Sequence, residues 1–510
     1  MKTCVVRRRF YSNEISNTTV DVDLEPNFGV PKAAMIFYVE TAATTDAFDT
    51  TSAYRNLGVG VIGPKIPSGT LGYECAHIVI RDNQDTSDSR RQSVSELLRA
   101  SDTAGGVYYR CTSGALNDSK IRFTFATSTP QTNVHLDTLI FAIGGDDVSV
   151  AVGATALNVN GGAAGSFVTT GGLSFQPDCI ISAGVYQPIA AGVNGNAPFT
   201  CGAATRLPFK ERFTGYFYQD NVDDNVQAAR TGTNAFLGHF SAAGTLVSTN
   251  LHQFNADGWV TRTFSTATSL ASYVFMAFKS QSPSNVALVD IVTQTATGLF
   301  STGLGISGFV PQTIIGSMTA VTAQNTTQSA SPEADALYFF AGMGQSFSKH
   351  YLGNGTATYS TGSATVTGSG STFFKFAPGF KLFTLDGLEI GTISSVASNT
   401  SLTLAANALQ TGTGVGYCYG THMQGSILLG DDDANENTNN NTKTYSKASS
   451  HLINLTLSTT PSDLHVADLI NFDTRPGFDV VTTTASASNR YGWCLAFKSA
   501  DANRRRGRSG

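Results

Sequence analysis

Trp259 to Ser280 read WVTRTFSTATSLASYVFMAFKS, and a second stretch, FDVVTTTASASNRYGWCLAFKS, covers Phe478 to Ser499. Each runs from a β-branched segment through a Ser/Thr/Ala turn into an aromatic segment that ends in AFKS. A weaker third copy, IRFTFATSTPQTNVHLDTLIFAIGG, covers Ile121 to Gly145. Self-similarity at a module-sized spacing is the signature of repeated structural units, so the three copies predict three modules of one fold.

Two further landmarks precede each ending in the same order. An opening with an aromatic residue, a proline and an apolar run occurs as FGVPKAAMIFYV from Phe28, FQPDCIISAGVY from Phe175 and FVPQTIIGSMTA from Phe309. A glycine and a short apolar run then lead into an Asp/Asn cluster in GYECAHIVIRDN from Gly72, GYFYQDN from Gly215 and GSILLGDDD from Gly425. Proline at the start of a run, β-branched residues within it and Asp/Asn after it are typical of strands and turns.

Composition favours an all-β protein. Of 510 residues only 14% are charged, 51 are glycine, and no stretch has a sustained helical period. The best helical candidate is RRQSVSELLRA, Arg90 to Ala100, which could equally be a solvated loop with one turn. We therefore expect three tandem repeated β-sandwich modules, of jelly-roll or lectin-like topology, with a small β-barrel-like insert in the third.

The spacing of the landmarks sets the expected domains. The third module is about 70 residues longer than the others, and Tyr351 to Gly420 have their own texture of short alternating strands and Gly/Ser/Asn turns. The expected domains are residues 1–147, 148–285, 286–349 with 420–500, an insert at 350–419 and a basic tail at 501–510.

Two geometric expectations follow from this division. A domain inserted into a surface loop needs ends that lie close together, so His350 and Thr421 should be neighbours in space. Aligning the closing strands on their shared alanine makes Ile143, Phe278 and Phe497 equivalent, which replaces a first alignment that used Phe141.

Charge and cysteine content limit the partners. A net charge of −5 argues against nucleic acid, because phosphate binding needs clustered Lys and Arg. The basic clusters Arg7 to Arg9 and Arg504 to Arg508 are expected to be solvated termini, with docking on an acidic partner as the alternative. No apolar run is long enough for membrane insertion, and the arginines interrupt any signal peptide. Seven cysteines without a C-x-x-C pair suggest a chain folded in a reducing cytoplasm.

Chemical motifs are sparse. The chain contains no G-x-S-x-G elbow, P-loop, H-E-x-x-H or paired Cys/His zinc spacing, so we expect no enzyme, no cofactor and no metal. Asp431, Asp433 and Asn435 alternate like the start of a calcium loop. Glu436 then stands where glycine is needed and Thr442 where a bidentate glutamate is needed, so an exposed polar loop is the preferred interpretation.

Two resemblances concern larger stretches. SATVTGSGSTFF and APGFKLFTLDGLEIGTISSVASNTSLTLAA, within the insert, resemble small β-domains of bacteriophage tail and fibre proteins, apart from Phe380, where an acidic residue is usual. The large modules, with FQPDCII, an Asp/Asn turn and a closing strand such as LAFKS, resemble a repeated β-sandwich module of phage virion proteins. These resemblances imply a virion component, folded and assembled in the bacterial cytoplasm.

Two functional classes then compete. The first is a tail fibre or tail-tip component for host adhesion, whose loops meet a host-surface glycan or protein. Its candidate contact residues are Asp82, Asp85, Asp220, Asp223, Asp224, Asp431, Asp433 and Asn435. The second is a capsid decoration or head–tail joining protein with a purely structural role. Both imply other virion proteins as partners and a homo-oligomer, with a trimer as one option.

A third class, a carbohydrate-active enzyme on the same scaffold, would need two carboxylates in a cleft lined with aromatic residues. Trp259 and Trp493 lie in or beside predicted core strands. Sugar stacking would therefore fall to tyrosines, for which the candidates are Tyr108, Tyr109, Tyr216 and Tyr218.

Overall fold

The computed structural model confirms an all-β protein in which every pair of neighbouring strands is antiparallel among the residues it describes. Those residues are 1–498 except 13, 17, 25–27, 44–46, 50–53, 82–88, 94, 102–105, 127–133, 158–164, 186–197, 220–225, 242–243, 265–270, 303–308, 310, 330–335, 344–350, 377–379, 386–387, 421–423, 432–443, 450, 458–461 and 472–476. One short 3-10 turn, η1 (Pro283–Asn285), lies between the second and third groups of strands, and another, η3 (Phe373–Lys375), lies in the insert.

Each of three units consists of a large and a small sheet. In unit 1 the large sheet has the order β1 (Lys2–Phe10), β11 (His135–Gly144), β3 (Pro31–Thr41), β5 (Tyr54–Pro64), β6 (Leu71–Arg81) and β7 (Ser89–Ser93). Its small sheet has the order β2 (Thr19–Asp23), β10 (Lys120–Ala126), β9 (Val107–Asn117) and β8 (Leu98–Ser101).

Units 2 and 3 repeat this strand order. The large sheet of unit 2 runs β12 (Ser149–Leu157), β21 (Ala271–Lys279), β14 (Cys179–Val185), β15 (Phe199–Arg206), β16 (Phe209–Gln219), β17 (Val226–Gly232), and its small sheet runs β13 (Ser166–Thr170), β20 (Gly258–Thr263), β19 (Gly244–Asn255), β18 (Leu237–Ser241). The large sheet of unit 3 runs β22 (Val286–Val292), β40 (Tyr491–Phe497), β24 (Thr313–Thr319), β26 (Ala336–Met343), β35 (Gln424–Asp431), β36 (Thr444–Ser449), and its small sheet runs β23 (Gly298–Thr302), β39 (Phe478–Thr484), β38 (Ser462–Asn471), β37 (Ile453–Leu457).

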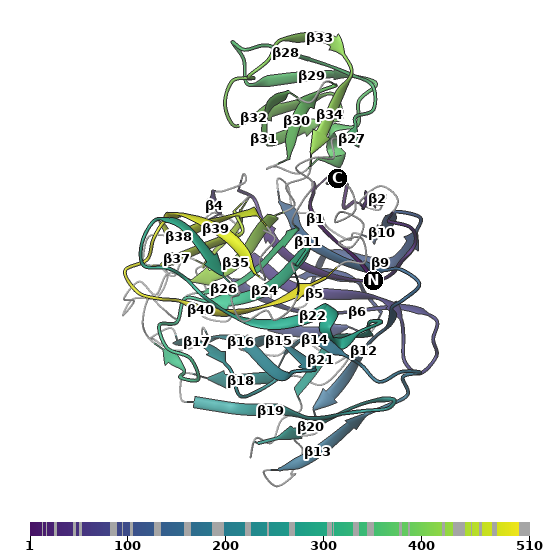
Figure 1. Cartoon of the computed structure of the whole chain (residues 1–510), viewed down its shortest axis with the longest axis vertical. Helices are drawn as coiled ribbons and strands as arrows, with labels where there is room; N and C mark the ends of the chain where they lie inside the picture. Colours follow the sequence, from purple (N-terminus) through teal and green to yellow (C-terminus); the bar gives the residue numbers. More distant parts are fainter. Residues whose placement is uncertain are drawn as a thin grey trace, which may run out of the picture.

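The three large sheets pack around a common centre, and the small sheets lie on the outside (Figure 1). Strands β6 and β7 of unit 1 pack against β12 and β14 of unit 2. Strands β16 and β17 pack in the same way against β22, β24 and β40 of unit 3. Strands β35 and β36 complete the circle against β1, β3 and β11. The chain is therefore a closed ring with approximate threefold symmetry.

Edge strands reinforce this ring. The short strand β4 (Phe48–Asp49) of unit 1 pairs with β36 of unit 3, and β25 (Gln328–Ser329) of unit 3 pairs with β17 of unit 2. Each comes from the same connection, between the third and fourth long strands of its unit. The exchange covers an edge that would otherwise expose unpaired backbone groups.

Strands of the large sheets are buried on both faces. In β21, Phe275 and Ala277 face the core of their own unit with Trp259, whereas Met276 and Phe278 belong to the core shared by the three units. Successive side chains of a strand point to opposite faces, so one face fills each core. This double burial explains why the closing strands are almost continuously apolar.

Aromatic rings meet where the units converge. The ring of Phe497 lies 4.7 Å from that of Phe141 and 5.8 Å from that of Phe278. The ring of Phe339 lies 4.8 Å from that of Phe37 and 6.2 Å from that of Phe199. Each group takes one ring from each unit, so the centre is packed with side chains from all three.

The predicted register of the closing strands is confirmed. Ile143 pairs with Ala33, Phe278 with Cys179 and Phe497 with Thr313. Each partner stands two residues after the opening proline of its unit. All three residues are fully buried, as equivalent positions should be.

The glycine landmark falls in the same strand of each unit but differs in register between units. Gly72, Gly215 and Gly425 all lie in the fifth long strand, but they pair with Gly63, Thr200 and Ala341. Tracing the ladders back to the opening prolines makes Glu74, Arg212 and Gly425 equivalent instead. Glycine occurs in this strand where a neighbouring side chain or backbone comes close, and that position differs between units.

Two expectations from the sequence are corrected. The helical candidate Arg90 to Ala100 contributes to strands β7 and β8, so it is neither a helix nor a solvated loop. Arg7 to Arg9 are not a solvated terminus, because they lie in β1 with 2–4% of their surface exposed. Arg9 donates two bonds to the Asp137 carboxylate, at 3.0 and 2.6 Å, across the β1–β11 pair. Cross-strand ion pairing makes burial of these cations tolerable.

The insert is a near-barrel of eight strands. Its order is β27 (Tyr351–Leu352), β34 (Tyr417–Gly420), β30 (Lys381–Thr384), β31 (Glu389–Ser398), β32 (Ser401–Leu404), β29 (Thr365–Ser369), β28 (Thr356–Tyr359) and β33 (Gly412–Val415). Figure 1 shows it projecting from the rim of the ring. His350 and Thr421 lie outside the described residues, but Tyr351, the next residue after His350, and Tyr419, two residues before Thr421, are cross-strand partners. Because β26 pairs with β35, the large sheet of unit 3 is continuous without the insert.

Candidate binding surfaces

The predicted contact loops join the fifth and sixth strands of the three large sheets. Asp82, Asp85, Asp220, Asp223, Asp224, Asp433 and Asn435 lie outside the described residues. Asp431 is the last residue of β35 and pairs with Thr444 of β36. The shared topology makes the preceding strands β6, β16 and β35 equivalent, and the role of these loops in contact stays a prediction.

The tyrosines expected to stack on sugars are largely unsuited to it. Tyr109 and Tyr216 are each 1% exposed, which removes them as surface platforms. Tyr108 is half-buried against the ring of Tyr54, 5.5 Å away, and the side chain of Tyr218 lies outside the described set. Trp259 and Trp493 are fully buried, as the sequence predicted.

A Ser–His pair occurs in unit 1, but its surroundings are those of a core network. The Nε2 atom of His77 lies 3.2 Å from the Ser101 hydroxyl, and both residues are at most 2% exposed. Asn56 bonds the backbone of Ser101 at 3.1 Å in both directions and also donates to Glu40. Burial raises the pKa of the Glu40 carboxyl to about 7. A substrate could not reach this hydroxyl, so we interpret the network as structural.

Thiols and metal ligands give no further chemistry. All seven cysteines are buried thiols, and desolvation raises the pKa of the Cys111 thiol to about 12. A buried neutral thiol is a poor nucleophile. Within the described part of the chain, no group of three or more His, Cys, Asp or Glu side chains could hold a metal ion.

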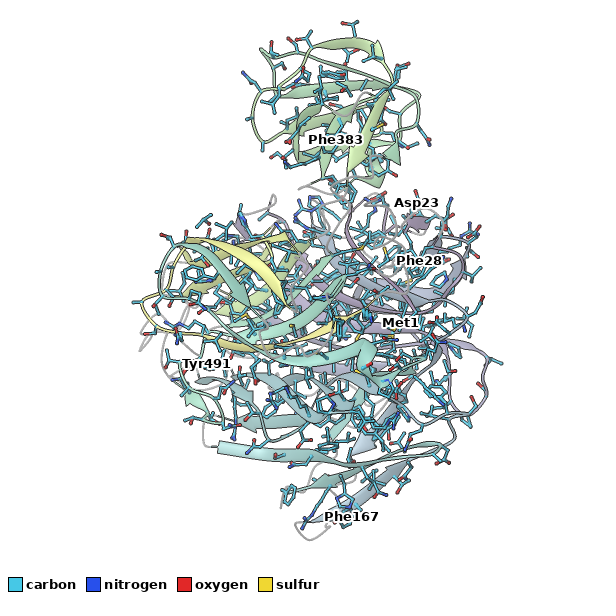
Figure 2. All side chains as sticks on the ribbon, viewed as in Figure 1. Met1, Asp23, Phe28, Phe167, Phe383 and Tyr491 are labelled. Atoms are coloured by element: carbon cyan, nitrogen blue, oxygen red, sulfur yellow. The ribbon has the colours of Figure 1, made fainter. Side chains whose placement is uncertain are left out.

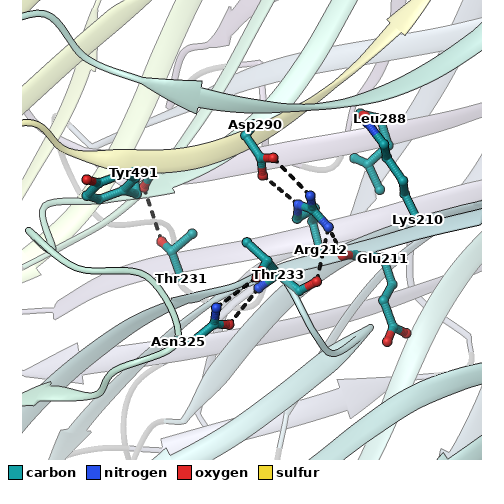
Figure 3. A network of polar contacts seen from close by, with 9 residues as sticks. All are labelled: Lys210, Glu211, Arg212, Thr231, Thr233, Leu288, Asp290, Asn325 and Tyr491. Carbon is teal, nitrogen blue, oxygen red and sulfur yellow. Dashed lines mark hydrogen bonds and ion pairs between the residues drawn. The ribbon is translucent and has the colours of Figure 1, made fainter. Parts of the chain in front are cut away.

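The junction of units 2 and 3 is polar at its rim (Figure 3). Arg212 of β16 donates to both carboxylate oxygens of Asp290 in β22, at 2.5 and 2.9 Å. Lys210 donates to the Leu288 carbonyl, and Thr231 donates to the Tyr491 carbonyl. These contacts hold neighbouring units together instead of presenting a ligand site.

Equivalent positions at the other two junctions carry different residues. Strand pairing makes Asp290 equivalent to Arg7 and Ala154, just as Arg212 is equivalent to Gly425 and Glu74. At the junction of units 3 and 1, a Cβ on Gly425 would lie 3.0 Å from the Arg7 side chain, so glycine leaves room for arginine. At the junction of units 1 and 2, Glu74 pairs with Lys65 of its own unit, and the position equivalent to Asp290 is the uncharged Ala154. The three junctions are therefore not interchangeable.

An exposed aromatic cluster lies on the small sheet of unit 2. Phe167 of β13 is 56% exposed and Phe264, just after β20, is 41% exposed. The Arg262 guanidinium carbon lies 5.6 Å from the ring centre of Phe167 and 4.6 Å from that of Phe264. The exposed His252 meets the Phe167 ring edge-on at 4.9 Å. Phe167 marks the end of the molecule farthest from the insert (Figure 2). We call these four residues the aromatic–arginine cluster.

None of the sequence motifs pointed to this cluster. Alternation does contain the signal: in SFVTT, Phe167 and Thr169 share the exposed face, while Thr170 is buried. In TRTF, Arg262 and Phe264 alternate with the buried Thr261 and Thr263.

The insert carries its own exposed apolar side chains. Leu385, Leu388, Leu409 and Val415 are 39–61% exposed. Leu385 packs over Gly416, next to Val415, and the Leu409 amide donates to the Ile390 carbonyl. Several of its aromatic residues are buried. Phe380, the departure from the phage tail pattern, is 4% exposed and its ring lies 6.4 Å from the Tyr419 ring.

Comparison with known proteins adds no assignment. No protein-family model matches the chain, and the search of curated proteins finds no match. The described residues include no helix long and apolar enough to cross a membrane.

Proposed function

We propose that the chain is a structural protein of a bacteriophage particle, in a tail fibre or tail tip, where it contributes to adhesion to the host surface. The observation that carries the proposal is that the chain combines a ring of three units with a separate projecting domain. Three units are locked by a shared core, whereas a small near-barrel projects from the rim without being needed to complete any sheet of the ring. A rigid body with a projecting module suits contact better than chemistry.

The surface also supports adhesion. Exposed apolar residues gather on the insert and on the small sheet of unit 2, at opposite ends of the molecule. Such exposure is costly in solution unless a partner covers it. Weak contacts repeated on the copies of a particle would add up through avidity.

A capsid decoration or head–tail joining protein is the second candidate. One specific observation favours it: the ring has approximate threefold symmetry within a single chain. A single copy of such a ring could cover a threefold position of a shell without a trimeric shaft.

A cryo-EM map of the phage particle tests both candidates. The adhesion proposal expects the ring at the tail tip or on a fibre, with the insert or the aromatic–arginine cluster facing outward. Density for the ring on the capsid shell or at the neck would favour the second candidate. Absence of the chain from purified particles would refute both.

A further inference from the structure

We infer that the aromatic–arginine cluster of unit 2 binds an acidic sugar residue of a glycan. The inference deepens the proposed adhesive function, because it names the chemical class of the surface ligand. It requires the cluster to be exposed, cationic and supplied with a free aromatic face.

The cation is available. Arg262 is exposed, and no described carboxylate forms an ion pair with it. The neighbouring segments 158–164 and 265–270, which the structure does not describe, contain no Asp or Glu in their sequence. A guanidinium that stacks on rings through its faces keeps the N–H donors along its edge, and these match the two oxygens of a carboxylate.

The aromatic faces supply the second part of the site. A pyranose ring presents C–H groups on one face, and an exposed phenyl ring attracts them through its negative face. Phe167, at 56% exposure, has the larger exposed fraction of the two rings, and the ring of Phe264 is the nearer to the guanidinium, at 4.6 Å. Thr169 lies on the same exposed face as Phe167 and offers a hydroxyl for hydrogen bonding.

The corresponding sheet of unit 1 shows what a plain solvated surface looks like. There Arg122 of β10 is paired with Asp21 of β2, at 2.7 and 2.9 Å, and Lys120 lies 3.5 Å from Asp23. No exposed aromatic ring stands beside them among the described residues of β2 and β10. The exposed arginine on the small sheet of unit 2 has two rings beside it and no acidic partner among the described residues, which points to a ligand that is anionic and has a flat apolar face.

The test measures binding of the purified full chain to three oligosaccharides by isothermal titration calorimetry or ligand-observed NMR. Oligosialic acid and oligogalacturonate supply carboxylates on sugar rings, and maltohexaose is the neutral control. We expect millimolar or tighter binding of at least one acidic oligomer and at least tenfold weaker binding of maltohexaose. Arg262→Gln and Phe167→Ala should each weaken acidic binding about tenfold or more, whereas Arg122→Gln in unit 1 should leave it unchanged.

Three outcomes would overturn the inference. The first is that neither acidic oligomer binds. The second is that Arg122→Gln weakens binding as much as Arg262→Gln, which would indicate general charge attraction. The third is that the chain self-associates and Phe167→Ala abolishes the association, which would make the surface a contact between copies. The circular dichroism spectrum of each variant shows whether it is folded. If Phe167→Ala is not folded, Phe167→Thr replaces it, because threonine favours strands.

Failure of this inference is distinguishable from failure of the proposed function. Binding by the purified chain needs no knowledge of its place on a particle, so the cluster can bind acidic glycans even if the ring lies on a capsid. Conversely, a ring found at a tail tip whose Arg262→Gln variant binds the acidic oligomers normally would keep the adhesion proposal and refute this site.

Discussion

The ring and the insert are both closed antiparallel structures, yet they achieve closure differently. Each unit of the ring buries one face of its large sheet in its own sandwich and the other against its neighbours, so every unit contributes to a core that it shares with the others. The insert fills its interior with its own residues, such as Phe373, Val366 and Leu402, and touches the ring through contacts such as that of Phe374 with Tyr11, 5.6 Å apart. Shared cores make the units interdependent, whereas we expect the insert to be separable, because its interior consists mainly of its own residues and reaches the ring cluster through contacts such as that with Tyr11.

Truncation of a central ring residue should have the largest effect. Phe497→Ala removes the ring that contacts Phe141 and Phe278 of the other units, and we expect a loss of about 3–5 kcal/mol in the free energy of unfolding of the ring. The matched change Phe373→Ala in the insert should leave the ring intact. Hydrogen exchange measured at increasing urea concentration reports the stability of the ring and of the insert separately. If each variant lost protection equally in both regions, the ring and the insert would not be independent.

Crowding one junction should have a smaller effect. Gly425→Ala places a Cβ 3.0–3.2 Å from Arg7, the Ser449 carbonyl and Leu139, so we expect a loss of about 1–3 kcal/mol. The control is Gly362→Ala in the insert, where the nearest atom would be 3.9 Å away. Thermal unfolding of the two variants measures the difference. An unchanged melting temperature for Gly425→Ala would show that this junction is loosely packed.

The pH dependence of stability should be partly set by Glu211, next to the junction of units 2 and 3. Burial raises the pKa of its carboxyl from 4.5 to about 7, despite the bond from the Leu251 amide. The folded state therefore keeps a proton that the unfolded state loses, and stability falls as pH rises from about 4.5 to 7. Glu211→Gln should remove up to about 3 kcal/mol of this fall, measured by urea unfolding at pH 5 and pH 8. If the free energy of unfolding fell equally between pH 5 and pH 8 in the wild type and in Glu211→Gln, Glu211 would not be protonated in the folded state.

Deletion of the insert should have the smallest effect on the ring. Joining residues 350 and 421 through a short Gly/Ser linker is expected to shift the melting temperature of the ring by no more than a few degrees, because Tyr351 and Tyr419 are already neighbours. Phage carrying the deletion should assemble or adsorb poorly. Failure of the ring to fold would make the insert part of the core, and normal assembly and adsorption would remove its proposed contact role.

The sequence patterns predicted the strands that recur in each unit, but not the features that depend on contacts between units or on which face of a strand is exposed. Opening prolines and closing strands recur because each unit needs the same ladder, which is why Ile143, Phe278 and Phe497 fall into register. The glycines of the third landmark differ in register because Gly425 leaves room for Arg7 of another unit, a contact that no local pattern contains. Arg7 to Arg9 look solvated in the sequence because their burial depends on partners such as Asp137, 128 positions away from Arg9. The exposed Phe167 was missed for the opposite reason, since hydrophobicity alone does not say which face of a strand meets water.

Differential scanning calorimetry of the full chain tests the central claim, that three units form one body to which a separable module is attached. Because unfolding enthalpy per residue is similar among globular proteins, the ring should unfold in one transition with about six times the enthalpy of a second transition from the 70-residue insert. Deletion of the insert should remove only the small transition. Three comparable transitions would show that the units fold independently, and a single transition that includes the insert would show that it belongs to the ring.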